Sequence, residues 1–179
     1  TYTAVWKEAD DVVYTTKYYL ENESGEYELD KTRINKATTG QSVTADKEQY
    51  DNRLYHLTDD LPSGTVAADG SLIFRVHYDR NTYSISFNSM GGTVSTEKKT
   101  ARWGSNVIAP VSVRAGYAFA GWYVDRACTE AFDGTMPAYD ITLYAKWDAD
   151  KVNYTVEHLV EKLDGSYELY DRQAFTSDT

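Results

Sequence analysis

Three histidines and one cysteine are the residues of this 179-residue chain whose types could support catalysis or metal binding. His56, His77 and His158 lie far apart, and none has a Cys or His at the spacing of a metal-binding motif. Cys128 is not followed by a base that would activate a thiolate nucleophile. Motifs of serine hydrolases, zinc proteases, P-loop proteins and dinucleotide-binding proteins are absent from the sequence. We therefore expect no catalytic, cofactor-binding or metal-ligating residue, and no enzyme.

Two pairs of adjacent carboxylates, Asp10-Asp11 and Asp59-Asp60, are the remaining candidates for cation binding. Neighbouring side chains of an extended chain point in opposite directions, and neither pair has the spacing of an EF-hand. We interpret both pairs as solvated loop charges, with weak calcium binding as the alternative. For Cys128 we expect a small, partly buried side chain.

Aromatic side chains are concentrated in segment 116–147 and could form either a core or a sugar-binding surface. A module of about 70 residues needs its large apolar side chains inside. We therefore expect three of the rings to lie in the core: Phe119, Trp122 and Trp147. A surface that contacts a ligand would instead use exposed rings, for which the candidates are Tyr117, Tyr123 and Tyr144.

Most of the chain has the alternation of polar and apolar residues that predicts strands. The clearest strands are expected at 71–78, 83–87 and 141–147. The same alternation over 118–124 places Phe119 with Tyr123 on one face and Trp122 on the other. The only helix that we expect is a short one over 44–52, beginning at Thr44 or Asp46. Ser-Gly and Asp-Gly pairs in "ENESGEY" and "EKLDGSY" predict hairpin turns.

The chain repeats itself with an offset of 140 residues. "YTTKYYLENESGEYELDK" at 14–31 resembles "YTVEHLVEKLDGSYELYD" at 154–171, and Trp6 corresponds to Trp147 upstream. We therefore expect a tandem array in which the sequence samples four pieces: the end of one unit at 1–8, complete segments at 9–80 and 81–148, and the start of a further unit at 149–179.

The net charge limits which kinds of partner the chain can be expected to bind. The chain carries a formal charge of −10, which disfavours nucleic acid because phosphate binding needs a basic surface. No apolar run approaches the roughly 20 residues of a membrane helix, so we expect no membrane insertion within this stretch. The first residue is Thr and no apolar signal segment follows it, which suggests a fragment of a longer protein.

Segment 83–147 resembles the internalin B-repeat family, also called the Listeria–Bacteroides repeat. The resemblance lies in "YSISFNSMGGTV", "GYAFAGWYVDRACTEAF" and "ITLYAKW", in the family's order. Segment 12–80 is similar to MucBP-like modules in "YTTKYYLENESGEYEL" and "SGTVAADGSLIFRVHYDRN". These resemblances imply an α+β, strand-dominated fold class of tandem small β-grasp-like modules. They also imply that 1–8 is the last strand of a preceding B-repeat, and that 149–179 begins a further, incomplete MucBP-like module.

The resemblance implies an extracellular location on the bacterial cell surface or cell wall. The linkers at 79–82 and 148–153 are too short and too poor in glycine to act as free tethers. We therefore expect a semi-rigid stalk or spacer, with adjacent repeats of the same chain as partners. The alternative is an adhesin module that binds a host glycan of mucin type or a host protein. We also expect the unpaired strand edges of the two ends to cause end-to-end self-association of the fragment.

Overall fold

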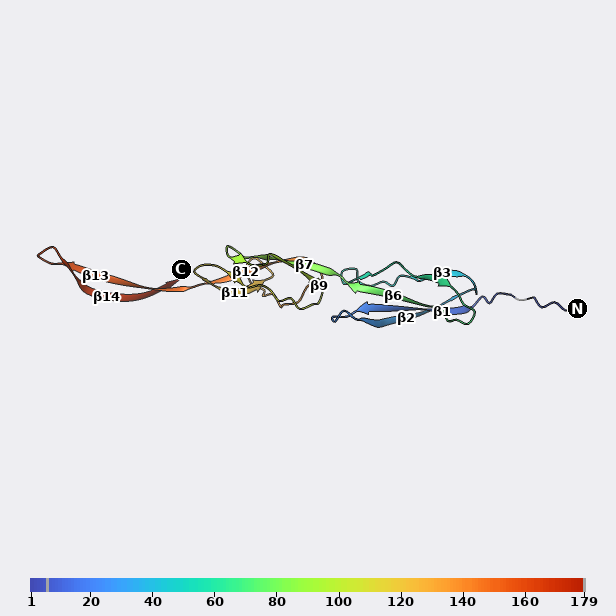
Figure 1. Ribbon diagram of the computed structural model, residues 1–179. Helices are drawn as coiled ribbons and strands as arrows, with labels where there is room; N and C mark the ends of the chain where they lie inside the picture. The colour runs from blue at the N-terminus through green and yellow to red at the C-terminus, as the bar shows by residue number, and fades with distance from the viewer. Residues whose placement is uncertain (6, 179) are drawn as a thin grey trace. The chain divides into compact units, whose positions relative to one another are not determined.

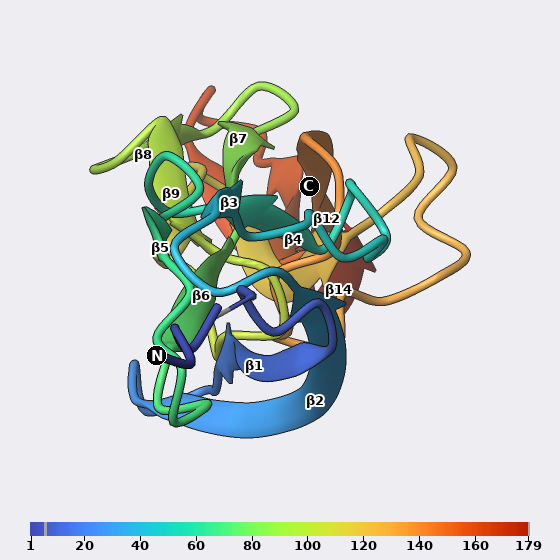
Figure 2. The same cartoon turned by 90° about the vertical axis from the view of Figure 1, so that its right-hand side faces the viewer.

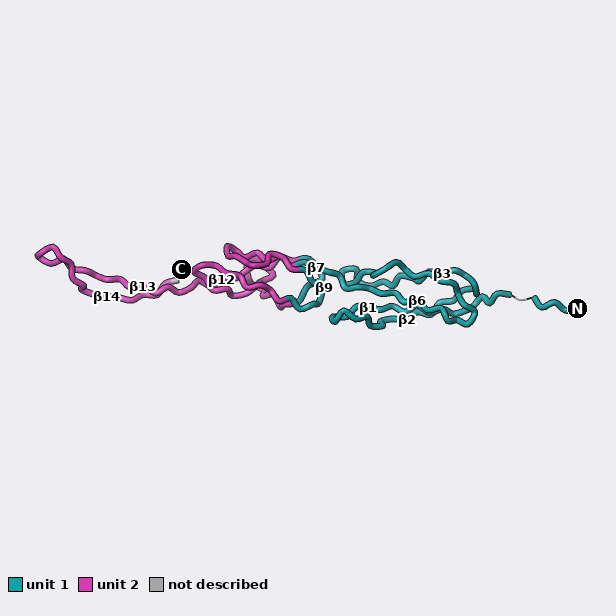
Figure 3. The backbone as a smooth tube through the Cα atoms, viewed as in Figure 1, with its two compact units in different colours: residues 1–84, 100–107, 135–140 teal, residues 85–99, 108–134, 141–179 magenta. Residues whose placement is uncertain are grey.

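The computed structural model describes residues 1–5 and 7–178 of the chain (Figure 1). It divides into two compact units (Figure 3). Unit 1 comprises residues 1–84, 100–107 and 135–140, and unit 2 comprises residues 85–99, 108–134 and 141–179. The described residues among 1–9 form no strand, and Trp6 lies outside the described residues. The assignment of 1–8 to a preceding repeat therefore stays a prediction.

Unit 1 is built on a sheet with the strand order β2-β1-β6-β4. The bounds are β1 Val12–Glu21, β2 Tyr27–Ala37, β4 Tyr55–Leu57 and β6 Ile73–Arg80. β1 pairs antiparallel with β2, which lies beside it in Figure 2, and parallel with β6. β4 pairs antiparallel with β6. Two short strands, β3 (Ser42–Thr44) and β5 (Ser63–Thr65), form a separate antiparallel pair.

Alternation along β1 and β6 creates the core of unit 1. Even-numbered residues of both strands point inward, and Tyr14 packs edge-to-face on Phe74 with 6.0 Å between ring centres. The buried set comprises Tyr14, Tyr18, Ala45, Val66, Phe74, Val76 and Tyr78. Because both strands contribute large rings to one face, the segment between β2 and β6 covers that face.

The predicted helix over 44–52 is wrong. Apart from the last residue of β3, this segment has no regular secondary structure, and Figure 1 draws no coiled ribbon there. The hydroxyl of Tyr18 donates to the carbonyl oxygen of Asp46 at 3.1 Å. The hydroxyl of Tyr78 accepts from the backbone N–H of Glu48 at 2.9 Å and donates to its carbonyl oxygen at 3.0 Å. Tyrosines from the sheet thus satisfy the backbone groups that a helix would have paired internally.

Unit 2 contains a sheet with the strand order β11-β12-β7-β9. The bounds are β7 Thr82–Asn88, β9 Lys98–Arg102, β11 Tyr117–Tyr123 and β12 Ile141–Ala149, and β7 and β9 contribute residues to both units. β12 pairs antiparallel with β11 and parallel with β7. The short strands β8 (Thr93–Val94) and β10 (Ser112–Val113) pair antiparallel beside it.

Strict alternation over 118–124 is also wrong, because Ala120 forms a β-bulge. Phe119 lies opposite Trp147, but the next pair joins Gly121 to Lys146. The extra residue brings Phe119 and Trp122 onto one face, with 5.4 Å between their ring centres. Gly121 has a φ of 122° beside the bulge, a conformation that favours glycine.

The core role of Trp122 is confirmed, since only 6% of its surface is exposed. Its indole N–H donates to the carbonyl oxygen of Pro110 at 2.7 Å. Trp147 and Phe119 are half-buried and pack on each other with 5.5 Å between ring centres. The indole N–H of Trp147 donates to the carbonyl oxygen of Ser89 at 2.9 Å. The three rings therefore line the inner face of the unit 2 sheet, as the core interpretation requires.

The last two strands form a hairpin, β13 (Lys151–Glu161) with β14 (Tyr167–Asp178). Its register shifts between His158 and Leu159, and that of β1 and β2 shifts between Tyr18 and Tyr19, which lie 140 residues earlier. The two turns also share hydrogen bonds: Gly25 donates to the carbonyl of residue 22, and Gly165 to that of residue 162. The two hairpins are therefore equivalent in register as well as in sequence.

The expected α+β class is wrong, whereas strand dominance and the division into several small sheets are confirmed. Residues 1–5 and 7–178 contain strands β1 to β14 and no helix. The physical reason is that the one predicted helix is replaced by an irregular segment held by tyrosine hydroxyls. It follows that the described residues contain no helix long and apolar enough to span a bilayer.

Candidate functional site

The three histidines lie in separate places of the fold. His56 is in β4, where its Nδ1 lies 2.7 Å from Oδ1 of Asn81. His77 is in β6 and contacts tyrosine rings, and His158 is in β13. Within residues 1–5 and 7–178, no three His, Cys, Asp or Glu side chains are grouped so that they could hold a metal ion.

Cys128 lies half-buried in a tight loop, with a φ of 54°. Its Sγ contacts the carbonyl oxygens of Arg126 and Ala145 at 3.9 and 4.0 Å. The loop is closed by Asp125, whose carboxylate accepts the backbone N–H of Glu130 at 2.9 Å, and this hydrogen bond lowers the pKa of Asp125. Carbonyl oxygens do not stabilise a thiolate, so the surroundings of Cys128 favour a structural thiol.

Two of the three candidate ligand-contact tyrosines lie together. Tyr123 of β11 and Tyr144 of β12 are directly opposite each other, on the outer face of the unit 2 sheet. Both are half-buried. Tyr117 lies apart from them on the face that carries Phe119, and the guanidinium of Arg114 lies 3.9 Å from its ring centre. The geometry thus pairs Tyr123 with Tyr144 and leaves Tyr117 out of that face.

Polar side chains extend the face around the tyrosine pair. The ammonium of Lys146 lies 5.1 Å from the ring centre of Tyr123. On the neighbouring strands an open hollow of about 550 Å³ is lined chiefly by polar residues: Ser86, Asn88, Ser89, Glu97, Lys98 and Thr142, with Phe87. Stacking rings beside hydroxyl, amide and charged groups could contact a polar ligand such as a sugar.

A second aromatic cluster lies on the outer face of the unit 1 sheet, and the sequence reasoning missed it. The ring of His77 stacks on Tyr19 with 5.1 Å between centres and meets Tyr27 edge-to-face at 4.7 Å. The hydroxyl of Tyr27 donates to Asp79, which also accepts from the hydroxyl of Thr58 at 2.9 Å. The strand expected at 71–78 contains His77, but the ring partners of His77 depend on the parallel pairing of β1 with β6, which the sequence does not reveal.

Two buried charges were also missed. Among the described residues, Glu21 and Arg80 are the charged side chains that are fully buried, with 2% and 3% of their surfaces exposed. The carboxylate of Glu21 accepts the backbone N–H of Arg80 at 2.9 Å and forms an ion pair with Arg102. A buried carboxylate needs such partners, because charge is costly to remove from water. No sequence motif signals this cluster.

Residues 103–105 complete the surroundings of Arg80 within unit 1. The guanidinium of Arg80 donates to the carbonyl oxygen of Trp103 and to the hydroxyl of Ser105, the latter at 3.2 Å. Its central carbon lies 5.4 Å from the ring centre of Trp103, which also meets Tyr55 edge-to-face at 5.6 Å. At Gly104 an added Cβ would lie 3.3 Å from this guanidinium. We call Glu21, Arg80, Arg102 and Trp103 the joint cluster.

Comparison with known proteins finds a family match for part of the chain. Residues 83–146 match the model of the Listeria-Bacteroides repeat domain. Two proteins of Evansella cellulosilytica are similar to parts of the chain, and their names describe them as membrane proteins, one of them Gly-rich. The Gly-rich protein is 34% identical over 104 residues, which cover 56% of this chain and 12% of the relative. The other is 39% identical over 82 residues, which cover 44% of this chain and 12% of the relative.

The matched stretches are thus a small part of relatives that are much longer than this chain. The predicted resemblance of segment 83–147 to the Listeria–Bacteroides repeat is confirmed by the family match. The chain therefore contains a repeat domain of a kind typical of bacterial surface proteins.

Proposed function

We propose that this chain is a non-catalytic spacer segment of an extracellular bacterial cell-surface protein, whose adjacent modules are joined semi-rigidly. The observation that carries the proposal is the joint cluster. It ties Glu21 and Arg80, which belong to segment 9–80, to Arg102 and Trp103, which belong to segment 81–148. All four residues lie within unit 1.

Backbone contacts reinforce the joint cluster at the linker. The backbone N–H of Trp103 donates to the carbonyl oxygen of Asn81 at 2.9 Å, and the N–H of Asn81 donates to that of Leu54 at 2.8 Å. The hydroxyl of Tyr83 donates to the carbonyl oxygen of Arg53 at 2.7 Å. A linker whose own peptide groups are bonded on both sides has little freedom to rotate. Such a linker suits a spacer better than a flexible tether.

The modular assignment belongs to the same proposal. Segment 81–148 is an internalin B-repeat-like module, segment 9–80 a MucBP-like module, and 149–179 the start of a further MucBP-like module. The parallel pairings of β1 with β6 and of β7 with β12 support related β-grasp-like modules. The shared hairpin register at an offset of 140 supports the tandem arrangement.

A display experiment tests the spacer function. A small binding domain is anchored to a bacterial surface through this chain, or through a Gly/Ser linker of equal length. At equal numbers of displayed binding domains per cell, we expect cells with the chain to capture more receptor-coated beads than cells with the linker. A flexible linker of this length is a collapsed coil on average, so it holds the binding domain closer to the cell surface. Arg80→Ala combined with Trp103→Ala should reduce capture toward that of the linker. Equal capture through the chain and the linker would contradict the spacer function.

A second candidate function is an adhesin module that binds a host glycan or protein. The observation that favours it is the Tyr123–Tyr144 pair beside Lys146 on the outer face of the unit 2 sheet. A glycan array probed with the chain tests this function. Binding should be lost in Tyr123→Ala with Tyr144→Ala, and retained in the control Tyr139→Ala, which removes an exposed ring elsewhere. An array without signal leaves the spacer as the better account.

A further inference from the structure

The hairpin of β13 and β14 presents an apolar face to solvent. Val152, Tyr154 and Val160 alternate along β13 and share this face with Phe175 of β14, which lies opposite Tyr154. Each of these four side chains is exposed by 40% or more. Tyr154 and Phe175 stack on each other with 5.4 Å between ring centres. Apolar side chains in such a row usually lie under another element.

The equivalent hairpin of unit 1 shows what covers such a face. Tyr14 stands where Tyr154 stands in the repeat, and its exposure is 8% against 48% for Tyr154. The difference arises because Phe74 of β6, which pairs in parallel with β1, packs on Tyr14, and because the segment between β2 and β6 covers the same face. The N–H of Thr15 donates to the carbonyl oxygen of Leu72 at 3.0 Å along that edge. In the described part of the chain, β13 pairs only with β14, so its other edge has no strand.

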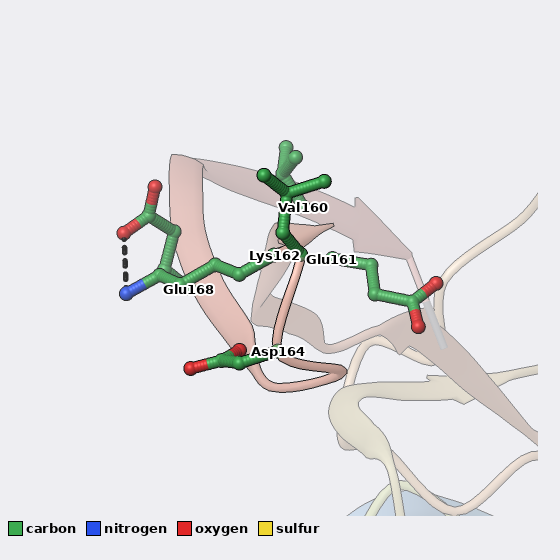
Figure 4. A pocket seen from close by; sticks show the side chains of 6 residues that line it. Val160, Glu161, Lys162, Asp164 and Glu168 are labelled. Atoms are coloured by element: carbon green, nitrogen blue, oxygen red, sulfur yellow. Dashed lines mark ion pairs between the residues drawn. The ribbon is translucent and has the colours of Figure 1, made fainter.

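Glu161 is a second feature that the β13–β14 hairpin shares with the β1–β2 hairpin. It stands where Glu21 stands, and Glu21 accepts the backbone N–H of Arg80 at the end of β6. Figure 4 shows Glu161 directed away from the ion pair that Lys162 forms with Glu168. The hollow around it, lined by residues 160–164 and Glu168, matches in position the one around Glu21. The acceptor for the end of a β6-like strand is therefore in place on this hairpin.

The opposite charges of the hairpin and of β6 also favour a β6-like strand as the partner of this hairpin. Residues 151–178 carry six carboxylates and three cationic side chains, whereas residues 73–80 carry two arginines and one aspartate. An acidic hairpin and a basic strand attract each other, which favours this strand over a second acidic hairpin.

We propose that the free edge of β13 is a strand-acceptor site that binds, in parallel, a strand with the chemistry of β6. The occupant has apolar residues at alternate positions, as in "SLIFRVHYDRN" at 71–81, with an arginine backbone N–H at its end that reaches Glu161. In unit 1, Ile73 of β6 lies opposite Thr15 of β1. If the bound strand adopts the same register, its residue equivalent to Ile73 lies opposite Thr155. Its Phe then packs on Tyr154, as Phe74 packs on Tyr14.

A synthetic peptide tests the site on the chain as it exists. The fluorescently labelled peptide SLIFRVHYDRN is titrated with the chain, and amide exchange of β13 is followed by NMR. We expect saturable binding and at least about tenfold slower exchange of the amides of Thr155 and Glu157, which face the free edge. The reversed peptide, NRDYHVRFILS, has the same composition and alternation but cannot reproduce a parallel register. It should bind at least about tenfold more weakly.

Three variants separate specific binding at this site from nonspecific binding. Glu161→Gln should weaken peptide binding at least about tenfold, because the acceptor loses its charge. Asp171→Asn, which neutralises a carboxylate of β14 outside this hollow, should leave binding unchanged. Thr155→Pro removes an edge donor at a position where an edge strand tolerates proline, and should abolish the exchange protection.

Three outcomes would overturn the proposal. The forward and reversed peptides could bind equally, which would indicate unspecific edge pairing. Glu161→Gln and Asp171→Asn could have the same effect, which would exclude the specific acceptor. Sedimentation could show a dimer that the peptide fails to dissociate and that Thr155→Pro converts to monomer, in which case a second copy of the chain occupies the edge instead.

Discussion

At the scale of single residues, stability depends on a few large rings and on carboxylates held by cations. Trp122 contacts Phe87 and Phe119 with ring centres 4.9 and 5.4 Å away and donates to Pro110. Glu48 lies between Lys31 and Arg33, with oxygen–nitrogen distances of 3.0 and 2.6 Å. The first is a packing interaction and the second an electrostatic one, so the two respond to different tests.

Replacing Trp122 tests the packing of the core. Trp122→Ala should lower the free energy of unfolding by ~3–5 kcal/mol, since a buried ring is replaced by a cavity. Urea unfolding followed by far-UV circular dichroism measures the change. Ile108→Ala, at a position that is 80% exposed, is the control and should change stability by less than about 0.5 kcal/mol. Wild-type stability of Trp122→Ala would mean that the ring is an exposed platform.

Glu48 gives the chain a predictable response to acid. The hydrogen bond from Lys31, aided by Arg33, lowers the pKa of Glu48 below its ordinary value. A carboxylate with a lowered pKa stabilises the fold above its unfolded pKa, and this contribution is lost as the pH falls through the folded pKa. Wild type should therefore be more stable than Glu48→Gln at about pH 6, and the difference should be smaller at about pH 3, below the ordinary pKa of a glutamate. Thermal melts of both proteins at the two pH values measure it, and a constant difference would contradict this role.

At the scale of elements, local patterns predicted strands well and interruptions poorly. The hairpin turns at Gly25 and Gly165 follow from their sequences, and both glycines have positive φ. The bulge at Ala120 has no local signal, because only pairing with β12 reveals which residue is extra. The absent helix over 44–52 has a similar cause, since tyrosine hydroxyls from distant strands satisfy its backbone. Long-range pairing therefore determined the structure of these two segments, which local propensity did not predict.

Removing the bulge tests this account of β11. Deletion of Ala120 leaves Phe119, Gly121 and Trp122 in strict alternation, with both rings still on the inner face. Unit 2 should therefore remain folded with a modest loss of stability. Deletion of Lys146 from the unbulged partner strand would instead move Ala145 and Trp147 to opposite faces, and should unfold the unit. Tryptophan fluorescence and amide spectra distinguish the outcomes, and equal disruption by both deletions would contradict the bulge assignment.

The candidate sites were predictable to different degrees for the same reason. Tyr123 and Tyr144 could be named from composition, but the sequence did not show that they oppose each other while Tyr117 lies elsewhere. Glu21 and Arg80 were invisible to motif search, because their partnership joins residues 59 positions apart through the parallel pairing of β1 and β6. The repeat, by contrast, was readable from sequence alone, since identical residues imply equivalent hairpins.

At the scale of the whole molecule, the proposed spacer function requires that the joint cluster hold neighbouring modules semi-rigidly. Glu21 is buried and paired with Arg102, so removing one partner leaves an uncompensated charge, which typically costs ~3–5 kcal/mol. Trp103 adds a ring contact with Tyr55 and a cation–π contact with Arg80. A joint of this kind should resist bending at room temperature and be released by substitutions that leave each module folded.

The most direct test is the distribution of distances between two spin labels, one on each side of the joint. Labels are attached at Lys47→Cys and Lys98→Cys, both exposed positions, after Cys128→Ser removes the native thiol. Pulsed electron paramagnetic resonance should give one narrow distribution, and Arg80→Ala with Trp103→Ala should broaden it markedly. A broad distribution in the unsubstituted joint, unchanged by those two replacements, would contradict the claim that the modules are joined semi-rigidly.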